Sequence, residues 1–66
     1  MFTVLTKNSM LGTSHYVGNF ATSAAAEDYA SRQKRQMRSF AGFELWTGTS
    51  RNPGRFVRDL GYGEVK

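Results

Sequence analysis

Few residues in this chain have the type and spacing that catalysis requires. His15 is the only histidine, and no sequence pattern places beside it the nucleophile and the orienting acid that a catalytic histidine needs. Glu27 and Asp28 form an adjacent carboxylate pair, but neighbouring helix residues point about 100° apart. Gly18, Gly61 and Gly63 lack the glycine and lysine spacing of a nucleotide-binding loop. We therefore expect no enzymatic activity and no nucleotide site.

Metal and cofactor binding are also not expected. Zinc sites need several histidine or cysteine ligands, and the chain has one histidine and no cysteine. Small secreted domains often depend on disulfides, so the absence of cysteine favours a reducing, intracellular setting. The first ten residues lack the apolar core of a signal peptide, and no apolar run approaches the roughly 20 residues of a membrane span. We expect a cytoplasmic protein without a cofactor or a membrane contact.

Charged residues offer a better indication of function. Nine Lys and Arg stand against five Asp and Glu, for a net charge of +4, which favours an acidic partner such as nucleic acid, an acidic protein surface or an anionic lipid. The alternative is that the charge serves only solubility. The first candidate binding surface is a set of cations on the outward face of an expected helix, the helix cations Arg32, Lys34, Arg35 and Arg38. Its alternative interpretation is a solvated helix face.

A second candidate surface combines Trp46 with cations of the following turn. Trp46 alternates with the apolar residues before it, so it is expected on the sheet face opposite the helix, where an exposed Trp is a frequent binding hot spot; alternatively it packs under Tyr16 or the C-terminal segment. If the turn folds next to the helix face, one basic surface results. A bare sheet face with Tyr and Trp beside Arg could also stack nucleobases. The cations of this turn flank Pro53 and are Arg51, Arg55 and Arg58.

The elements that position these residues follow from the spacing of apolar side chains. Residues 2–7 and 15–20 alternate as strands do and are separated by turn residues, which predicts a β-hairpin with Tyr16, Gly18 and Phe20 on one face. A helix is expected over Ser23–Phe40, capped by Thr22 or Ser23 and closed by 41–42. Glu27 and Asp28 are expected in its first turn, where the helix dipole favours negative charge. Its inward face has residues spaced by three and four, namely Ala26, Ala30, Gln33, Met37 and Phe40.

The last third of the chain completes the expected sheet. Residues 43–47 have strand alternation, and 51–54 form a turn with Pro and Gly at favoured positions. Residues 55–60 fit either a fourth strand or a short helix, and residues 61–66 are expected to fray. The whole chain, residues 1–66, is predicted to be one α+β domain, a small antiparallel sheet of three or four strands with one α-helix packed on one face.

From residue 1 to residue 50 the chain resembles the small inhibitors of host RNA polymerase made by T7-like bacteriophages. The matching residues are Phe2-Thr3-Val4, Tyr16-Val17 with Phe20-Ala21-Thr22, Ala26-Glu27 with Ala30, and Ala41-Gly42-Phe43-Glu44-Leu45. The resemblance implies a few strands with one helix, and action by binding in the cytoplasm of a bacterial host. The family uses acidic residues against the polymerase, whereas this helix is basic. The resemblance therefore implies a phage regulatory protein without identifying its target.

A second resemblance is to SPOR domains, which bind peptidoglycan. Val17–Thr22 followed by Ala26 and Ala30 is similar to the first half-repeat of that family, but the second half-repeat is poorly formed here. Together these observations predict a small non-enzymatic binding protein, a phage-encoded regulator or inhibitor that docks on a host protein. The alternative is a basic nucleic-acid-binding module.

Overall fold

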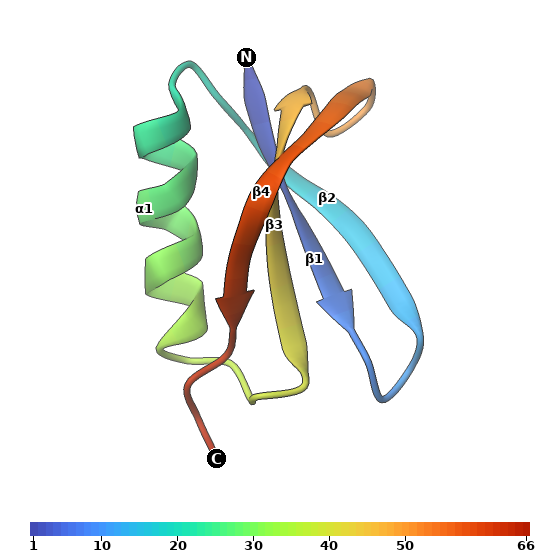
Figure 1. Ribbon diagram of the computed structural model, residues 1–66, viewed down its shortest axis with the longest axis vertical. Coiled ribbons are helices and arrows are strands. Elements are labelled where there is room, and N and C mark those ends of the chain that lie inside the picture. Colours follow the sequence, from blue (N-terminus) through green and yellow to red (C-terminus); the bar gives the residue numbers. More distant parts are fainter.

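The computed structural model describes all 66 residues and has a four-stranded antiparallel sheet with one helix against one face (Figure 1). The strands lie in the order β2-β1-β3-β4. This confirms the predicted fold class and shows that residues 55–60 belong to a strand. No helix combines the length and apolar character that crossing a bilayer would require. The elements are β1 (Phe2–Asn8), β2 (Thr13–Phe20), α1 (Ser23–Lys34), β3 (Ala41–Gly48) and β4 (Pro53–Tyr62).

The predicted hairpin is formed by β1 and β2, which pair from Val4↔Val17 to Asn8↔Thr13. The Asn8 side chain fixes the loop, because its Oδ1 accepts hydrogen bonds from the backbone N–H groups of Met10 (3.0 Å) and Leu11 (3.1 Å). This is the local turn chemistry that favours Asn at such positions.

A β-bulge in β2 changes which side chains share a face. The register of β1 and β2 shifts between Phe2 and Val4, and Gly18 has φ +78°, a conformation that glycine adopts without strain. Tyr16, before the bulge, points to the helix-free face. Phe20, after it, packs beside Tyr29 of α1 at a ring-centroid distance of 5.4 Å. The prediction that Tyr16 and Phe20 share one face was wrong, because the extra residue reverses the alternation.

The core lies between α1 and the sheet. Thr22 caps the helix as predicted, with its Oγ1 accepting from the N–H of Ala25 at 3.1 Å. Ala26 and Ala30 are buried as expected, and their small side chains let the helix approach the sheet closely. The strand residues of this core are Val4, Ala41, Phe43 and Leu45.

The helix ends at Lys34 and not at Phe40, so its predicted length was wrong. The C-terminal segment captures the groups that a longer helix would use: the N–H of Glu64 donates to the Lys34 carbonyl (2.8 Å), and the N–H of Val65 to the Met37 carbonyl (3.0 Å). Residues 61–66 are therefore tied to the domain and not a free tail. Residues 35–40 form turns, with Met37 39% exposed and Phe40 half-buried.

Two smaller boundary predictions were also wrong. Residues 41–42 do not close the helix, because they begin β3. The helix has no acidic residue in its first turn, so the dipole does not explain Glu27 and Asp28. Both carboxylates form ion pairs with arginines instead.

Candidate binding surface

The helix-free face of the sheet carries three aromatic rings in contact, which we call the aromatic row: Tyr16 on β2, Trp46 on β3 and Phe56 on β4. Trp46 meets Tyr16 edge-to-face at a centroid distance of 5.3 Å and Phe56 at 6.1 Å, a geometry that aromatic pairs prefer. The structure thus places Trp46 opposite the helix, as predicted. It is also half-buried between its neighbours, so the alternative of packing against Tyr16 holds as well.

The aromatic row lies beside two buried side chains of β1 on the same face of the sheet. Leu5, the β1 partner of Tyr16, is 8% exposed, and Thr3, the partner of Trp46, is fully buried. The Thr3 hydroxyl donates to the Gly18 carbonyl at 2.7 Å. The row therefore has ordered neighbours, while Phe56 still keeps 51% of its surface exposed.

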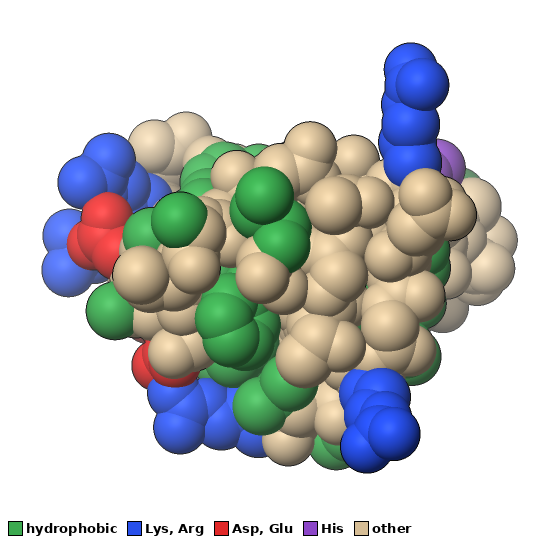
Figure 2. All heavy atoms as spheres, turned by 90° about the horizontal axis from the view of Figure 1, so that it is seen from above, with side chains coloured by type: hydrophobic (Ala, Val, Ile, Leu, Met, Phe, Trp, Pro, Cys, Tyr) green, Lys and Arg blue, Asp and Glu red, His purple; other side chains and the backbone are tan.

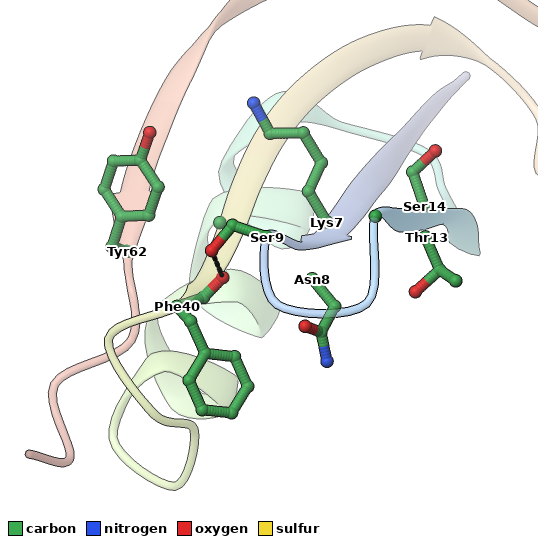
Figure 3. Close-up of a pocket in the computed structure, with 9 residues that line it drawn as sticks. Lys7, Asn8, Ser9, Thr13, Ser14, Phe40 and Tyr62 are labelled. Carbon is green, nitrogen blue, oxygen red and sulfur yellow. Dashed lines mark hydrogen bonds between the residues drawn. The ribbon is translucent and has the colours of Figure 1, made fainter.

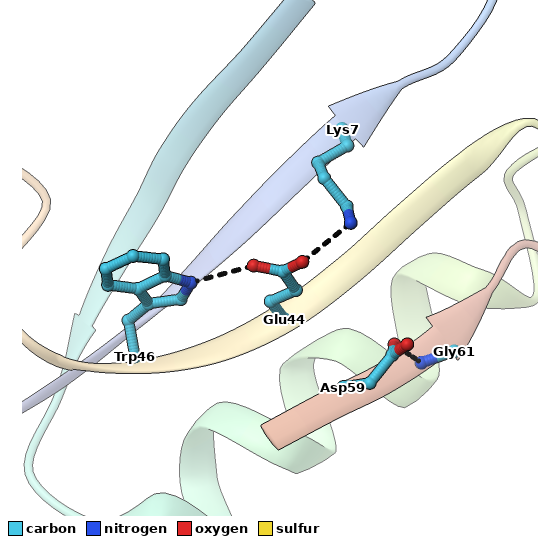
Figure 4. Close-up of polar contacts among 5 residues, drawn as sticks. All are labelled: Lys7, Glu44, Trp46, Asp59 and Gly61. Carbon is cyan, nitrogen blue, oxygen red and sulfur yellow. Dashed lines mark hydrogen bonds and ion pairs between the residues drawn. The ribbon is translucent and has the colours of Figure 1, made fainter. Parts of the chain in front are cut away.

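Two hydrogen bonds to the Glu44 carboxylate, from Lys7 and from Trp46, fix the Trp46 ring from the side (Figure 4). Glu44 accepts from the Lys7 ammonium at 2.6 Å and from the Trp46 indole N–H at 3.0 Å, one on each carboxylate oxygen. The hydrogen bond from Lys7 lowers the pKa of Glu44, against the opposing effect of burial, and the same bond raises the pKa of Lys7. Asp59 lies nearby on β4 and accepts from the N–H of Gly61 at 2.8 Å. The ionised Glu44 thus holds the indole in one orientation.

A shallow pocket of about 290 Å³ lies beside the β1–β2 loop at the end of the sheet (Figure 3). Two of its nine lining residues are hydrophobic, and within it the Ser9 hydroxyl donates to the Phe40 carbonyl at 3.0 Å. No group of three or more His, Asp or Glu side chains lies close enough to hold a metal ion. The lining residues are Lys7, Asn8, Ser9, Gly12, Thr13, Ser14, Phe40, Gly42 and Tyr62.

Most of the helix cations take part in contacts within the domain. Arg32 forms an ion pair with Asp28 one turn earlier at 2.8 Å. The Lys34 ammonium donates to the Leu60 carbonyl at 2.8 Å, and the Arg38 guanidinium to the Lys66 carbonyl at 2.9 Å. Arg35, at the C-cap of α1, is exposed and its side chain makes no hydrogen bond or ion pair. Of the predicted set, Arg35 is therefore the most available to a partner.

Two of the three cations of the β3–β4 turn lie away from the helix cations. Arg51 and Arg55 are exposed and form no ion pair, whereas Arg58 pairs with Glu27 of α1. The turn lies at the top of Figure 1, and residues 35–38 lie at the bottom. Seen from above, the Lys and Arg side chains on this side of the molecule form separate groups around the rim, with apolar, neutral and, on the left, acidic atoms between them (Figure 2). The turn cations and the helix cations therefore do not form the single basic surface that was predicted for a turn folded next to the helix face.

Several residues of the helix-free face were not found from the sequence. Phe56, Lys7 and Glu44 gain their significance from neighbours on other strands: Trp46 pairs with Phe56 in the register of β3 and β4. A count along the chain from a turn with residue 51 opposite 54 places Asp59 opposite Trp46, and the register shifts between β3 and β4 bring Phe56 there instead. Neither this pairing nor that of Lys7 with Glu44 has a local signal in the sequence.

No protein-family model, curated protein or solved structure matches this chain. The resemblances to phage polymerase inhibitors and to SPOR domains therefore stay predictions. The function has to be argued from the surfaces described above.

Proposed function

We propose that this chain is a non-enzymatic binding protein that docks on another protein through the helix-free face of its sheet. One observation carries the proposal: the aromatic row of Tyr16, Trp46 and Phe56, in which Glu44 holds the Trp46 indole and Phe56 is half exposed. Aromatic residues are enriched in protein interfaces and dominate their energetics. A pre-ordered row of rings loses little conformational entropy when a partner binds.

The charges on this face favour a protein over a nucleic acid as the partner. The positive charge of Lys7 is neutralised by Glu44. Asp59, the β4 partner of Glu44, adds a further negative charge beside it. A phosphate backbone laid along Lys7, Glu44 and Asp59 would meet net negative charge. A protein surface could match this face, with apolar side chains against the rings and a few hydrogen-bond donors against the carboxylates.

The resemblance to phage polymerase inhibitors supports a more specific form of this proposal. In that form the chain is a phage-encoded regulator that acts in the bacterial cytoplasm by docking on a host protein, with host RNA polymerase as the first partner to test. The helix cations were the first candidate binding surface in the sequence analysis. Because Arg32, Lys34 and Arg38 already have partners within the domain, the aromatic row is now the better candidate.

The experiment is a capture from nuclease-treated bacterial lysate that compares two surfaces. Immobilised wild-type chain is compared with Phe56→Ala and with Arg35→Ala/Arg38→Ala, each first checked for folding by circular dichroism. We expect a host protein that wild type and the arginine variant retain and that Phe56→Ala loses; purified RNA polymerase is then tested directly. Retention by Phe56→Ala with loss in the arginine variant would move the contact to the helix end.

A second candidate function, nucleic-acid binding, is favoured by the cations at the C-terminal end of α1. Lys34, Arg35, Arg38 and Lys66 lie in segments that hydrogen-bond to one another, and none of them forms an ion pair with a carboxylate. About four phosphate contacts would make affinity fall with salt with a log–log slope near −3 to −4. A gel shift that is present at low salt and lost in Arg35→Ala/Arg38→Ala would support this candidate; no shift at low salt would reject it.

A further inference from the structure

The two edges of the sheet differ in how they are protected from pairing with another strand. An edge strand presents unpaired N–H and C=O groups, and native proteins usually blunt it with charges, proline or bulges. β4 has all three: Pro53 at its start, charged side chains along it, and register shifts against β3 at several positions. The charged residues of β4 are Arg55, Arg58 and Asp59.

The β2 edge lacks most of this protection. Its sequence, TSHYVGNF, contains no proline and no Lys, Arg, Asp or Glu. From Thr13 to Val17 it pairs residue for residue with β1, and the bulge at Gly18 comes only after this straight segment. β2 is an edge strand that pairs only with β1, and in Figure 1 no other ribbon runs along its outer side.

The outward backbone groups of β2 have no partner within the domain. β2 pairs only with β1, and none of the backbone hydrogen bonds outside the helix and strands involves residues 13–20. Thr3 and Thr6 of β1 donate to carbonyl groups of β2 from the opposite side. The outer edge is therefore a straight, neutral row of free donors and acceptors.

We propose that two copies of this chain pair through β2, antiparallel, to form one continuous eight-stranded sheet. A second copy is the occupant that this edge fits best, because an antiparallel pair related by a two-fold axis is self-complementary. β2 contains no Lys, Arg, Asp or Glu. The net charge of +4 on each chain therefore does not place like charges against each other where the two strands meet. The two-fold axis would stand perpendicular to the sheet.

This arrangement places both helices on one side of the joined sheet and both aromatic rows on the other. The dimer would thus present two copies of the row to the same side. The proposal concerns the edge of the sheet and does not depend on what the aromatic row binds.

The first test uses the absence of cysteine, since each single-cysteine variant then has one thiol. Ser14→Cys, His15→Cys and Tyr16→Cys sample the straight part of β2, and Val57→Cys on β4 is the control. A disulfide forms only where two Cα atoms come within about 7 Å. Mild oxidation should give a cross-linked dimer at one preferred β2 position and none at Val57. Equal cross-linking on both edges would overturn the proposal.

The second test measures the dimer by sedimentation equilibrium over a range of concentrations. His15→Lys puts a charge on an exposed position of β2 and should weaken dimerisation at least about tenfold. Val57→Lys adds the same charge to β4 and should leave it unchanged. Wild-type chain that stays monomeric at millimolar concentration, or equal effects of the two lysines, would overturn the proposal. A monomeric result would leave the binding role of the aromatic row untouched.

Discussion

Removing the Phe56 ring should weaken partner binding strongly and should also cost the fold a comparable free energy, so the two losses have to be measured separately. The side chain is 51% exposed in the free domain, and an aromatic side chain buries about 150–250 Å² when it is fully covered. About 100 Å² is therefore left for a partner to cover. At roughly 25 cal/mol per Å² this is about 2.5 kcal/mol, which corresponds to a roughly 60-fold weaker Kd for Phe56→Ala.

The cost to folding should be smaller than for a core phenylalanine. A fully buried Phe→Ala costs about 3–5 kcal/mol, and Phe56 is only half covered, so about 2 kcal/mol is expected from its lost contact with Trp46 and the sheet. The affinity is measured by calorimetry with the captured partner, at a temperature where urea titration shows the variant to be folded. Phe56→Leu, which keeps an apolar side chain, should lie between Phe56→Ala and wild type.

The control is Val57→Ala, because Val57 is the next residue on β4 and is 44% exposed, but it lies outside the aromatic row. Its Kd should stay within about threefold of wild type, as expected for a near-neutral position. If Val57→Ala and Phe56→Ala weaken binding equally, or if neither does, the aromatic row is not the contact surface.

Three further predictions concern stability. Leu45→Ala should lose about 2–5 kcal/mol in urea unfolding because Leu45 is 1% exposed, whereas Met37→Ala should lose less than about 1 kcal/mol because Met37 is 39% exposed; the reverse order would contradict the helix end at Lys34. Thr22→Ala should cost about 1 kcal/mol through the lost cap, again by urea titration. The pKa of Glu44 is lowered in the folded state. Its contribution to the free energy of unfolding is therefore full above the ordinary carboxyl pKa of about 4.3 and disappears as the pH falls through the folded-state pKa. A pH series of unfolding should show this loss in wild type and not in Glu44→Gln.

The parts of the fold that depend on local spacing could be predicted from the sequence. Alternation in residues 2–7 and 43–47 was enough to define two strands, and the same alternation assigned Trp46 to the face away from the helix. Ala26 and Ala30 were placed correctly on the inward face because a helical stripe is also a local pattern. Each of these predictions needed only a residue and its near neighbours.

The failures share a different cause, which is competition from distant segments. The three- and four-residue spacing continues to Met37 and Phe40, yet the helix stops where Glu64 and Val65 donate hydrogen bonds to it and to the following turn. The bulge at Gly18 likewise depends on how β2 registers against β1. Periodicity along the chain has no information about either contact.

The size of the domain explains why the candidate binding surface lies where it does. One helix of 12 residues covers one face of a four-stranded sheet and leaves the other without a second layer. On that face Leu5 and Thr3 are buried beside the rings of Tyr16 and Trp46, and Phe56 stays half exposed at the border. A partner that covers this face would supply the missing layer and bury apolar area that the domain cannot bury alone. The helix end offers mainly exposed cations, and exposed ion pairs are each worth only about 0–1 kcal/mol, so the sheet face is where a partner gains most.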